Sequence, residues 1–352
     1  MIKATLPSVL LIETGGTITH TRGHDKVLRP SNQSVLAHLK DIGHHARVSV
    51  DRLPTAMDST NMLHEQRVMI AQKIYDNAHE FDGFVVVHGT DTMPDTAAAL
   101  TYMLQGLGKP VMLTGSQLPI NDERTDAKIN LYSAIIAATQ DYGEVGIAFG
   151  GKVLRGPRAI KISSEDFDAF DSPRAPPIGR AGINIEPLEG RITRKDAAKE
   201  LRFFPHFDTN IGFFYPMSGV GHKVFASQVK SPDLHGFVFV GFGAGNIPEV
   251  YYDSLEHARA LHKPIVVVTQ CIMGSTNMGL YEASAKPLEL GVISGGDMTM
   301  QTTTQKLMYA LGKAEWKHFE GEKRIEYVRD NVMYREYAKE IDSASIEKLN
   351  GH

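Results

Sequence analysis

The sequence has one cysteine, Cys271, among its 352 residues and therefore cannot form an internal disulfide. A fold without disulfides does not depend on an oxidising compartment. No apolar run approaches the roughly 20 residues of a membrane-spanning helix, and the run at 8–12 is too short for a secretory signal. These absences predict a cytoplasmic protein with no membrane partner. Cys271, which has no local histidine or asparagine, is predicted to be a buried free thiol.

Neither sign of charge is in excess, because 37 Lys and Arg residues balance 41 Asp and Glu residues at a net charge of −4. Nucleic-acid-binding domains usually carry a basic patch, and this chain has no basic run long enough to form one. The histidines do not follow the H-E-x-x-H spacing, and a single cysteine excludes C-x-x-C. The sequence therefore predicts no nucleic-acid partner and no metal site.

Short apolar runs alternate with segments of helical periodicity, which is typical of βαβ units with a mostly parallel sheet. At roughly 150 residues per domain, the length predicts two domains. A change of character at 191–208 indicates a linker between a larger N-terminal α/β domain over 1–190 and a smaller C-terminal α/β domain over 209–352. The predicted strands are 9–12, 84–88, 110–114, 146–149, 237–240 and 265–269, and the predicted helices are 65–79, 94–107, 126–139, 250–262 and a charged tail over 301–349.

Threonine stands beside glycine where two predicted strands end, in TGGT at 14–17 and GTDT at 89–92. In parallel sheets the ligand crevice lies at the carboxyl ends of the strands. Glycine permits a close approach of backbone to ligand, and a threonine hydroxyl becomes a nucleophile when a base stands next to it. The same residue types are common in turns and helix caps, so spacing alone leaves a structural and a catalytic interpretation open.

Several segments resemble the bacterial-type L-asparaginase family. IETGGTI at 12–18 and VHGTDTM at 87–93 match its two threonine signatures, which are specific when they occur together. The resemblance covers nearly the whole chain and favours the cytoplasmic type I branch. Further similar segments are DSTNM at 58–62, LTGSQ at 113–117, FDSP with PPIG over 170–179, GFGAGN at 241–246 and NMG at 277–279.

The resemblance implies hydrolysis of L-asparagine to L-aspartate and ammonia through a threonine acyl-enzyme, with no metal or cofactor. It also implies a homodimer or homotetramer whose subunits share their active sites. By motif position, Thr14 is the nucleophile, and Thr90, Asp91 and Lys161 form a second catalytic group. The candidate substrate-binding residues are Asp58, Ser59, Thr60, Asp91 and, from a neighbouring subunit, Glu282.

These residue types suit the chemistry. In the implied mechanism Asp91 holds Lys161, Lys161 polarises Thr90, and the resulting proton relay protonates the leaving amide nitrogen. Without the resemblance, Lys161 reads as a solvated edge lysine and Asp91 as the N-cap of the following helix. Glu282 reads equally well as a solvated loop residue.

The chain departs from the family pattern at Val27, where the family usually places a loop tyrosine that contacts the nucleophile. Either another hydroxyl or a water replaces this tyrosine, or turnover is slow, or the substrate differs. Thr19 and His24 are the substitutes nearest in sequence. Two other functions stay open: a glutaminase or amidotransferase-type subunit that passes ammonia to a partner, and a weakly catalytic amino-acid sensor. A dinucleotide site at GFGAG, 241–245, is disfavoured because no acidic residue ends the next strand.

Overall fold

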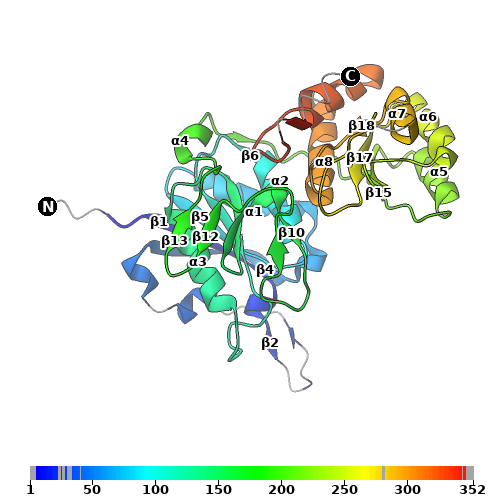
Figure 1. Ribbon diagram of the computed structural model, residues 1–352. Helices are drawn as coiled ribbons and strands as arrows, with labels where there is room; N and C mark the ends of the chain where they lie inside the picture. Colours follow the sequence, from blue (N-terminus) through cyan, green and yellow to red (C-terminus); the bar gives the residue numbers. More distant parts are fainter. Residues whose placement is uncertain are drawn as a thin grey trace. The chain divides into compact units, whose positions relative to one another are not determined.

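The computed structural model describes residues 5–22, 25, 28–29, 34–39, 41–279, 282–342 and 344–345. The chain divides into two compact units, Met1–Pro205 and His206–His352. Each unit contains a sheet with helices packed beside it (Figure 1). The predicted fold class, two α/β domains with mostly parallel sheets and the larger domain first, is confirmed.

The larger unit is built on an eight-stranded sheet with the order β13-β12-β9-β8-β7-β5-β1-β4. Pairing is parallel from β8 to β4 and antiparallel among β8, β9, β12 and β13. The strands are β1 (Ser8–Gly15), β4 (Arg47–Met57), β5 (Gly83–Val87), β7 (Val111–Thr114), β8 (Val145–Phe149), β9 (Lys152–Arg155), β12 (Gly179–Ala181) and β13 (Ile185–Pro187).

Helices and three small two-stranded sheets complete the larger unit. The helices are α1 (His64–Asp76), α2 (Met93–Met103), α3 (Ala127–Thr139) and α4 (Arg194–Ala197), and short 3₁₀ turns include η1 (Thr17–Thr19), η2 (Val35–His38) and η4 (Ser59–Asn61). The small sheets pair β2 (Thr21–Arg22) with β3 (Leu28–Arg29), β6 (Leu104–Gln105) with β14 (Arg202–Phe203), and β10 (Ile160–Lys161) with β11 (Phe170–Asp171).

The central strands are apolar because both faces of the sheet are covered. Alternate residues such as Leu11 and Val85 pack with Leu131 and Ile135 of α3, and all four side chains are fully buried. Burial of this kind stabilises the fold by about 1.5–3 kcal/mol for each large aliphatic side chain. The edge strand β4 is largely exposed, so it lacks the continuous apolar run by which its neighbours were predicted.

The smaller unit has a parallel sheet with the order β15-β16-β17-β18. Helices α5, α6 and α8 lie around this sheet in Figure 1. The strands are β15 (Ile211–Phe214), β16 (Gly236–Gly241), β17 (Ile265–Thr269) and β18 (Ile293–Ser294). The helices are α5 (His222–Lys230), α6 (Tyr252–Ala260), α7 (Glu282–Glu289), α8 (Met300–Trp316), α9 (Gly321–Glu326) and the π-helix η7 (Tyr327–Met333).

Two predictions about the smaller unit are wrong. The charged tail predicted to be helical over 301–349 is helical only in part: His318 and Gly321, which take positive φ angles, separate α8 from α9 and η7, and residues 334–342 are not helical. Cys271 is exposed rather than buried, because it lies in the loop beyond the end of β17.

The predicted linker at 191–208 contains α4 and β14, and both bind residues of the larger unit. The Arg194 guanidinium donates to the carbonyls of Asp82 and Gln140 at 2.6 and 2.9 Å. Strand β14 pairs with β6. Among the described residues, no helix is both long enough and apolar enough to cross a membrane.

A buried ion pair joins α8 to the segment that follows η7. Lys306 and Glu340 are both fully buried, and the Lys306 ammonium donates to Glu340 Oε1 at 2.8 Å and to the carbonyls of Met333 and Arg335. Burial alone would raise the pKa of Glu340, but Lys306 and two backbone amides hold it below its ordinary value. The pair therefore fixes the segment around Glu340 to α8.

Replacing one partner of this pair is expected to destabilise the protein. Lys306→Met leaves the Glu340 carboxylate buried without its cation, which typically costs about 3–5 kcal/mol. Lys286→Met is the matched control, because Lys286 pairs with Glu289 at 3.0 Å on the exposed surface, where such a pair contributes about 1 kcal/mol or less. Urea unfolding checks both. Equal shifts in the two variants would contradict the assignment.

Candidate active site

Three of the segments singled out in the sequence meet at the carboxyl ends of adjacent strands. Strand β1 lies between β4 and β5 and runs parallel to both. The register pairs Glu13 with Val87 and Gly15 with Met57. Thr14 therefore lies beside the turn that follows β5 and the turn that follows β4.

Glycines allow these turns to touch. Gly16, at φ 86°, lies so close to Gly89 that an added Cβ would stand 2.5 Å from the Gly89 Cα. A Cβ on Gly89 would stand 2.6 Å from Ser59 Oγ. Side chains are excluded from Gly16 by the positive φ and from both positions by the close approach of neighbouring atoms. The two threonine signatures are thus in direct backbone contact.

Lys161 joins the residues that follow β5. Its ammonium donates to Thr90 Oγ1 at 2.8 Å and to Asp91 Oδ1 at 2.7 Å, across about 70 positions of sequence. The Lys161 side chain is 18% exposed and that of Asp91 is 51% exposed. Within the described part of the chain the second Asp91 oxygen has no hydrogen-bond partner. The arrangement can hold the Lys161 proton against a hydroxyl while leaving one carboxylate oxygen for a ligand.

Gln117 anchors the segment that carries Lys161. Its side-chain amide donates to the carbonyls of Ser163 and Asp166 at 3.4 and 3.1 Å. Its backbone amide donates to the Asp126 carboxylate. Sequence reasoning singled out the LTGSQ segment but assigned Gln117 no role, because nothing local indicates which loop its amide reaches.

Thr14 is placed differently from Thr90. Thr14 is 1% exposed, and its hydroxyl donates to the carbonyl of Val87 at 2.9 Å. A carbonyl cannot take the proton, and the described residues bring no carboxylate, imidazole or amine to Thr14 Oγ1. Thr19 donates to the Gly16 carbonyl at 3.0 Å. His24 and Val27 lie outside the described residues.

The remaining candidate binding residues lie in and beside the turn after β4. Asp58 caps η4, since its Oδ1 accepts from the Thr60 amide at 2.9 Å and from the Thr60 hydroxyl at 3.0 Å. Ser59 is buried against Gly89, whereas Thr60 is exposed. Glu282 begins α7, and its side chain lies outside what the structure describes.

Two buried histidines flank these turns. Burial lowers the pKa of His88 to about 4, although its hydrogen bond to Gly89 opposes the shift. Burial also lowers the pKa of His20, against the attraction of the nearby Asp58 carboxylate. A buried imidazole that releases its proton avoids the free-energy cost of an unpaired buried charge. His88 is therefore neutral near pH 7.

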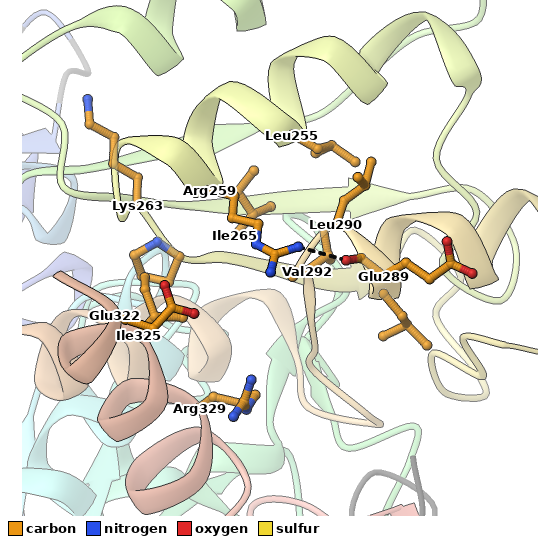
Figure 2. A pocket seen from close by; sticks show the side chains of 13 residues that line it. Leu255, Arg259, Lys263, Ile265, Glu289, Leu290, Val292, Glu322, Ile325 and Arg329 are labelled. Carbon is orange, nitrogen blue, oxygen red and sulfur yellow. Dashed lines mark hydrogen bonds between the residues drawn. The ribbon is translucent and has the colours of Figure 1, made fainter.

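A cavity of about 170 Å³ in the smaller unit is lined by charged side chains but by none of the predicted catalytic residues (Figure 2). Arg259 points toward Glu289 and donates to its backbone carbonyl at 3.0 Å. Lys263 donates to the carbonyls of Val229 and Ser231. Arg259 and Lys263 are thus both hydrogen-bonded to backbone carbonyls. This cavity is therefore a weaker candidate for a catalytic site than the turns of the larger unit.

Two family models match the chain. Residues 8–192 match "Asparaginase, N-terminal", and residues 210–319 match "Glutaminase/Asparaginase C-terminal domain". The first match contains Thr14, Thr90, Asp91 and Lys161.

Named relatives agree with these matches. The chain is 35% identical to L-asparaginase 1 of Escherichia coli K12 over 314 residues, which cover 87% of this chain and 92% of that protein. The solved structure of the thermostable L-asparaginase from Thermococcus kodakarensis matches with a TM-score of 0.85 at 30% identity. The match covers 96% of this chain and 99% of that chain. L-asparaginase I from Vibrio cholerae also gives a TM-score of 0.85, at 31% identity, with 96% of this chain and 100% of that chain covered.

Proposed function

The chain belongs to the asparaginase family of amidohydrolases, and on that basis we propose that it hydrolyses L-asparagine to L-aspartate and ammonia. The observation that carries the proposal is the contact of Lys161 with both Thr90 and Asp91, next to the strand end that bears Thr14. A lysine between a hydroxyl and a carboxylate can transfer a proton, which an amide leaving group requires. Residues 1–190 and 209–352 would form its two domains.

In the proposed mechanism Thr14 Oγ1 attacks the side-chain amide carbon of asparagine. As the C–O bond forms, the Thr14 hydroxyl would give up its hydrogen bond to the Val87 carbonyl and pass its proton to a water molecule. The tetrahedral intermediate collapses when the C–N bond breaks, and the Thr90–Lys161 pair supplies the proton with which ammonia departs. Water then cleaves the ester on Thr14, releasing aspartate and restoring the hydroxyl.

The proposed substrate contacts follow from charge. The Asp91 oxygen that Lys161 leaves open would bind the substrate's α-ammonium group. The Ser59 hydroxyl would bind the α-carboxylate, which requires hydrogen-bond donors. The Gly16 amide already donates to the Met57 carbonyl at 2.9 Å. Asp58 and Thr60 would hold the Ser59 turn in shape through the cap that they form.

An ammonia-release assay tests the function. L-asparagine, L-glutamine and D-asparagine are supplied at equal concentrations, with and without candidate partner proteins. Faster release from L-asparagine supports the proposal. Faster release from L-glutamine would instead indicate the glutaminase type, and release that depends on a partner would indicate the amidotransferase type. Binding of L-asparagine without ammonia release would indicate a sensor. L-Asparagine and L-glutamine differ by one methylene, worth about 1–3 kcal/mol of binding free energy, so the assay must compare them directly.

We further propose a cytoplasmic homodimer or homotetramer that degrades asparagine. The family resemblance supports this assembly, and so does an exposed apolar patch on the smaller unit. Met217, Val220 and Val250 are each more than half exposed and line one cavity of about 510 Å³. Large exposed apolar side chains that gather in one place usually mark a protein interface.

A mixed-oligomer experiment tests whether Glu282 completes the site of a neighbouring subunit. Thr14→Ala and Glu282→Ala subunits are each expected to be inactive, and hybrids of the two are expected to regain activity at interfaces that hold both native residues. Ammonia release from co-refolded hybrids measures this. Full activity of Glu282→Ala alone, or hybrids that never recover, would show that Glu282 has no role in the neighbouring site.

A further inference from the structure

A buried chain of hydrogen bonds runs from α1 to the turn that carries Thr90. Arg67 Nε lies 3.2 Å from Thr96 Oγ1, Thr96 Oγ1 lies 2.9 Å from His88 Nε2, and His88 Nδ1 lies 2.7 Å from the Gly89 carbonyl oxygen. Arg67, Thr96 and His88 are all buried. The family signature contains His88, but nothing in the residue spacing connects it to a threonine eight positions later.

The chemistry of the two ends fixes the direction of every bond. Arg67 Nε only donates and the Gly89 carbonyl only accepts. His88 Nδ1 therefore carries the proton that Gly89 accepts, and burial, which lowers the pKa of His88 to about 4, keeps the other ring nitrogen unprotonated. Thr96 accepts from Arg67 and donates to that nitrogen. Each polar atom in the chain has a partner, and the imidazole is held in one tautomer.

The acceptor at the end of this chain belongs to the peptide that joins Gly89 to Thr90. A peptide group is planar, so fixing its carbonyl oxygen also fixes the direction of the Thr90 amide and Cα. On its other side Gly89 is in contact with Gly16 and Ser59. The peptide is thus held from both sides, and the Thr90 hydroxyl reaches Lys161 from it at 2.8 Å.

We propose that His88 and Thr96 are positioning residues that fix the Gly89–Thr90 peptide and so hold the Thr90 hydroxyl on Lys161. The inference rests on the proposed hydrolysis, in which Thr90 and Lys161 transfer the proton. His88 does not touch the reacting atoms and acts through Thr90. Displacement of a catalytic group by about 1 Å can lower turnover about 10²-fold.

Two substitutions of His88 distinguish a positioning role of this residue from a role in core packing alone. The side-chain amide of His88→Asn can place an N–H donor near the position of Nδ1, toward Gly89, whereas that of His88→Gln reaches the position of Nε2, toward Thr96. His88→Asn is expected to keep kcat within about threefold of the native value. His88→Gln is expected to lose at least about tenfold in kcat, with a KM within about threefold, since the substrate-binding groups are unchanged.

Thr96→Val provides a second variant, because it keeps the shape and removes the hydroxyl that orients the ring. Thr101→Val is its matched control, since Thr101 lies on the same helix, is also buried, and donates to the Ala97 carbonyl of its own helix at 2.9 Å. Thr96→Val is expected to lower kcat about tenfold. Thr96→Ser, which keeps the hydroxyl, and Thr101→Val are both expected to keep the native kcat.

Crystal structures of the variants give a readout that does not depend on turnover. The hydrogen bond between Lys161 Nζ and Thr90 Oγ1 is expected to persist in His88→Asn and to be broken in His88→Gln. An intact bond in His88→Gln, or equal kcat in the Asn and Gln variants at equal stability, would overturn the positioning role. If the native enzyme releases no ammonia from asparagine while His88→Gln breaks the Lys161–Thr90 bond, the proposed function is overturned and the positioning role stands.

Discussion

Thr14→Ala is expected to abolish ammonia release from L-asparagine while the protein stays folded and still binds substrate. The variant loses the proposed nucleophile, and the other hydroxyl residue of β1, Ser8, lies at the opposite end of the strand. The lost hydrogen bond to the Val87 carbonyl costs only about 1 kcal/mol of stability. Steady-state ammonia assays and calorimetric binding of L-asparagine measure the two effects separately.

The chain offers a matched control for Thr14. Thr114 ends β7, is fully buried, and donates to the carbonyl of Ala148 at 2.8 Å, just as Thr14 donates to Val87. Thr114→Ala is expected to lose the same stability and to keep its turnover. If Thr14→Ala retains turnover within about tenfold of the native rate, or if both variants lose it equally, Thr14 is not the nucleophile.

Lys161→Met is expected to lower kcat by at least about 10²-fold, the usual effect of removing a positioned proton-transfer group. Methionine keeps the length of the side chain and removes the ammonium that contacts Thr90 and Asp91. Because the variant removes a group that transfers a proton, the pH dependence of kcat is also expected to change. Rates measured across the pH range in which the native enzyme is active check both effects.

Lys73→Met controls for the general loss of a lysine–aspartate pair. Lys73 Nζ contacts Asp51 Oδ2 at 2.7 Å, the same distance as in the Lys161 pair, and exposure is comparable. Its substitution is expected to leave kcat unchanged, since it lies on α1 away from the threonine turns. An unchanged pH profile and kcat in Lys161→Met would reduce Lys161 to a structural lysine.

The predicted strands with continuous apolar runs are present because that pattern has a simple physical cause. The strand at 9–12, for example, forms the middle of β1, which is covered on both faces and so needs apolar side chains at successive positions. Strand β4 was not predicted, because its edge position leaves most of its side chains exposed and removes the signal. The tail was predicted to be helical throughout, whereas left-handed backbone angles at His318 and Gly321 divide it and residues 334–342 are not helical.

The sequence by itself determined the family, because IETGGTI and VHGTDTM are runs of consecutive residues whose identities are independent of the rest of the fold. It also determined which residue types stand at the strand ends. Only the tertiary structure decided which of them touch. The ammonium of Lys161 meets Thr90 about 70 positions away, and His88 meets Thr96 across the turn into α2. Such contacts depend on the order of strands in the sheet and on the packing of helices against strands. The spacing of residues along the chain predicts neither of these.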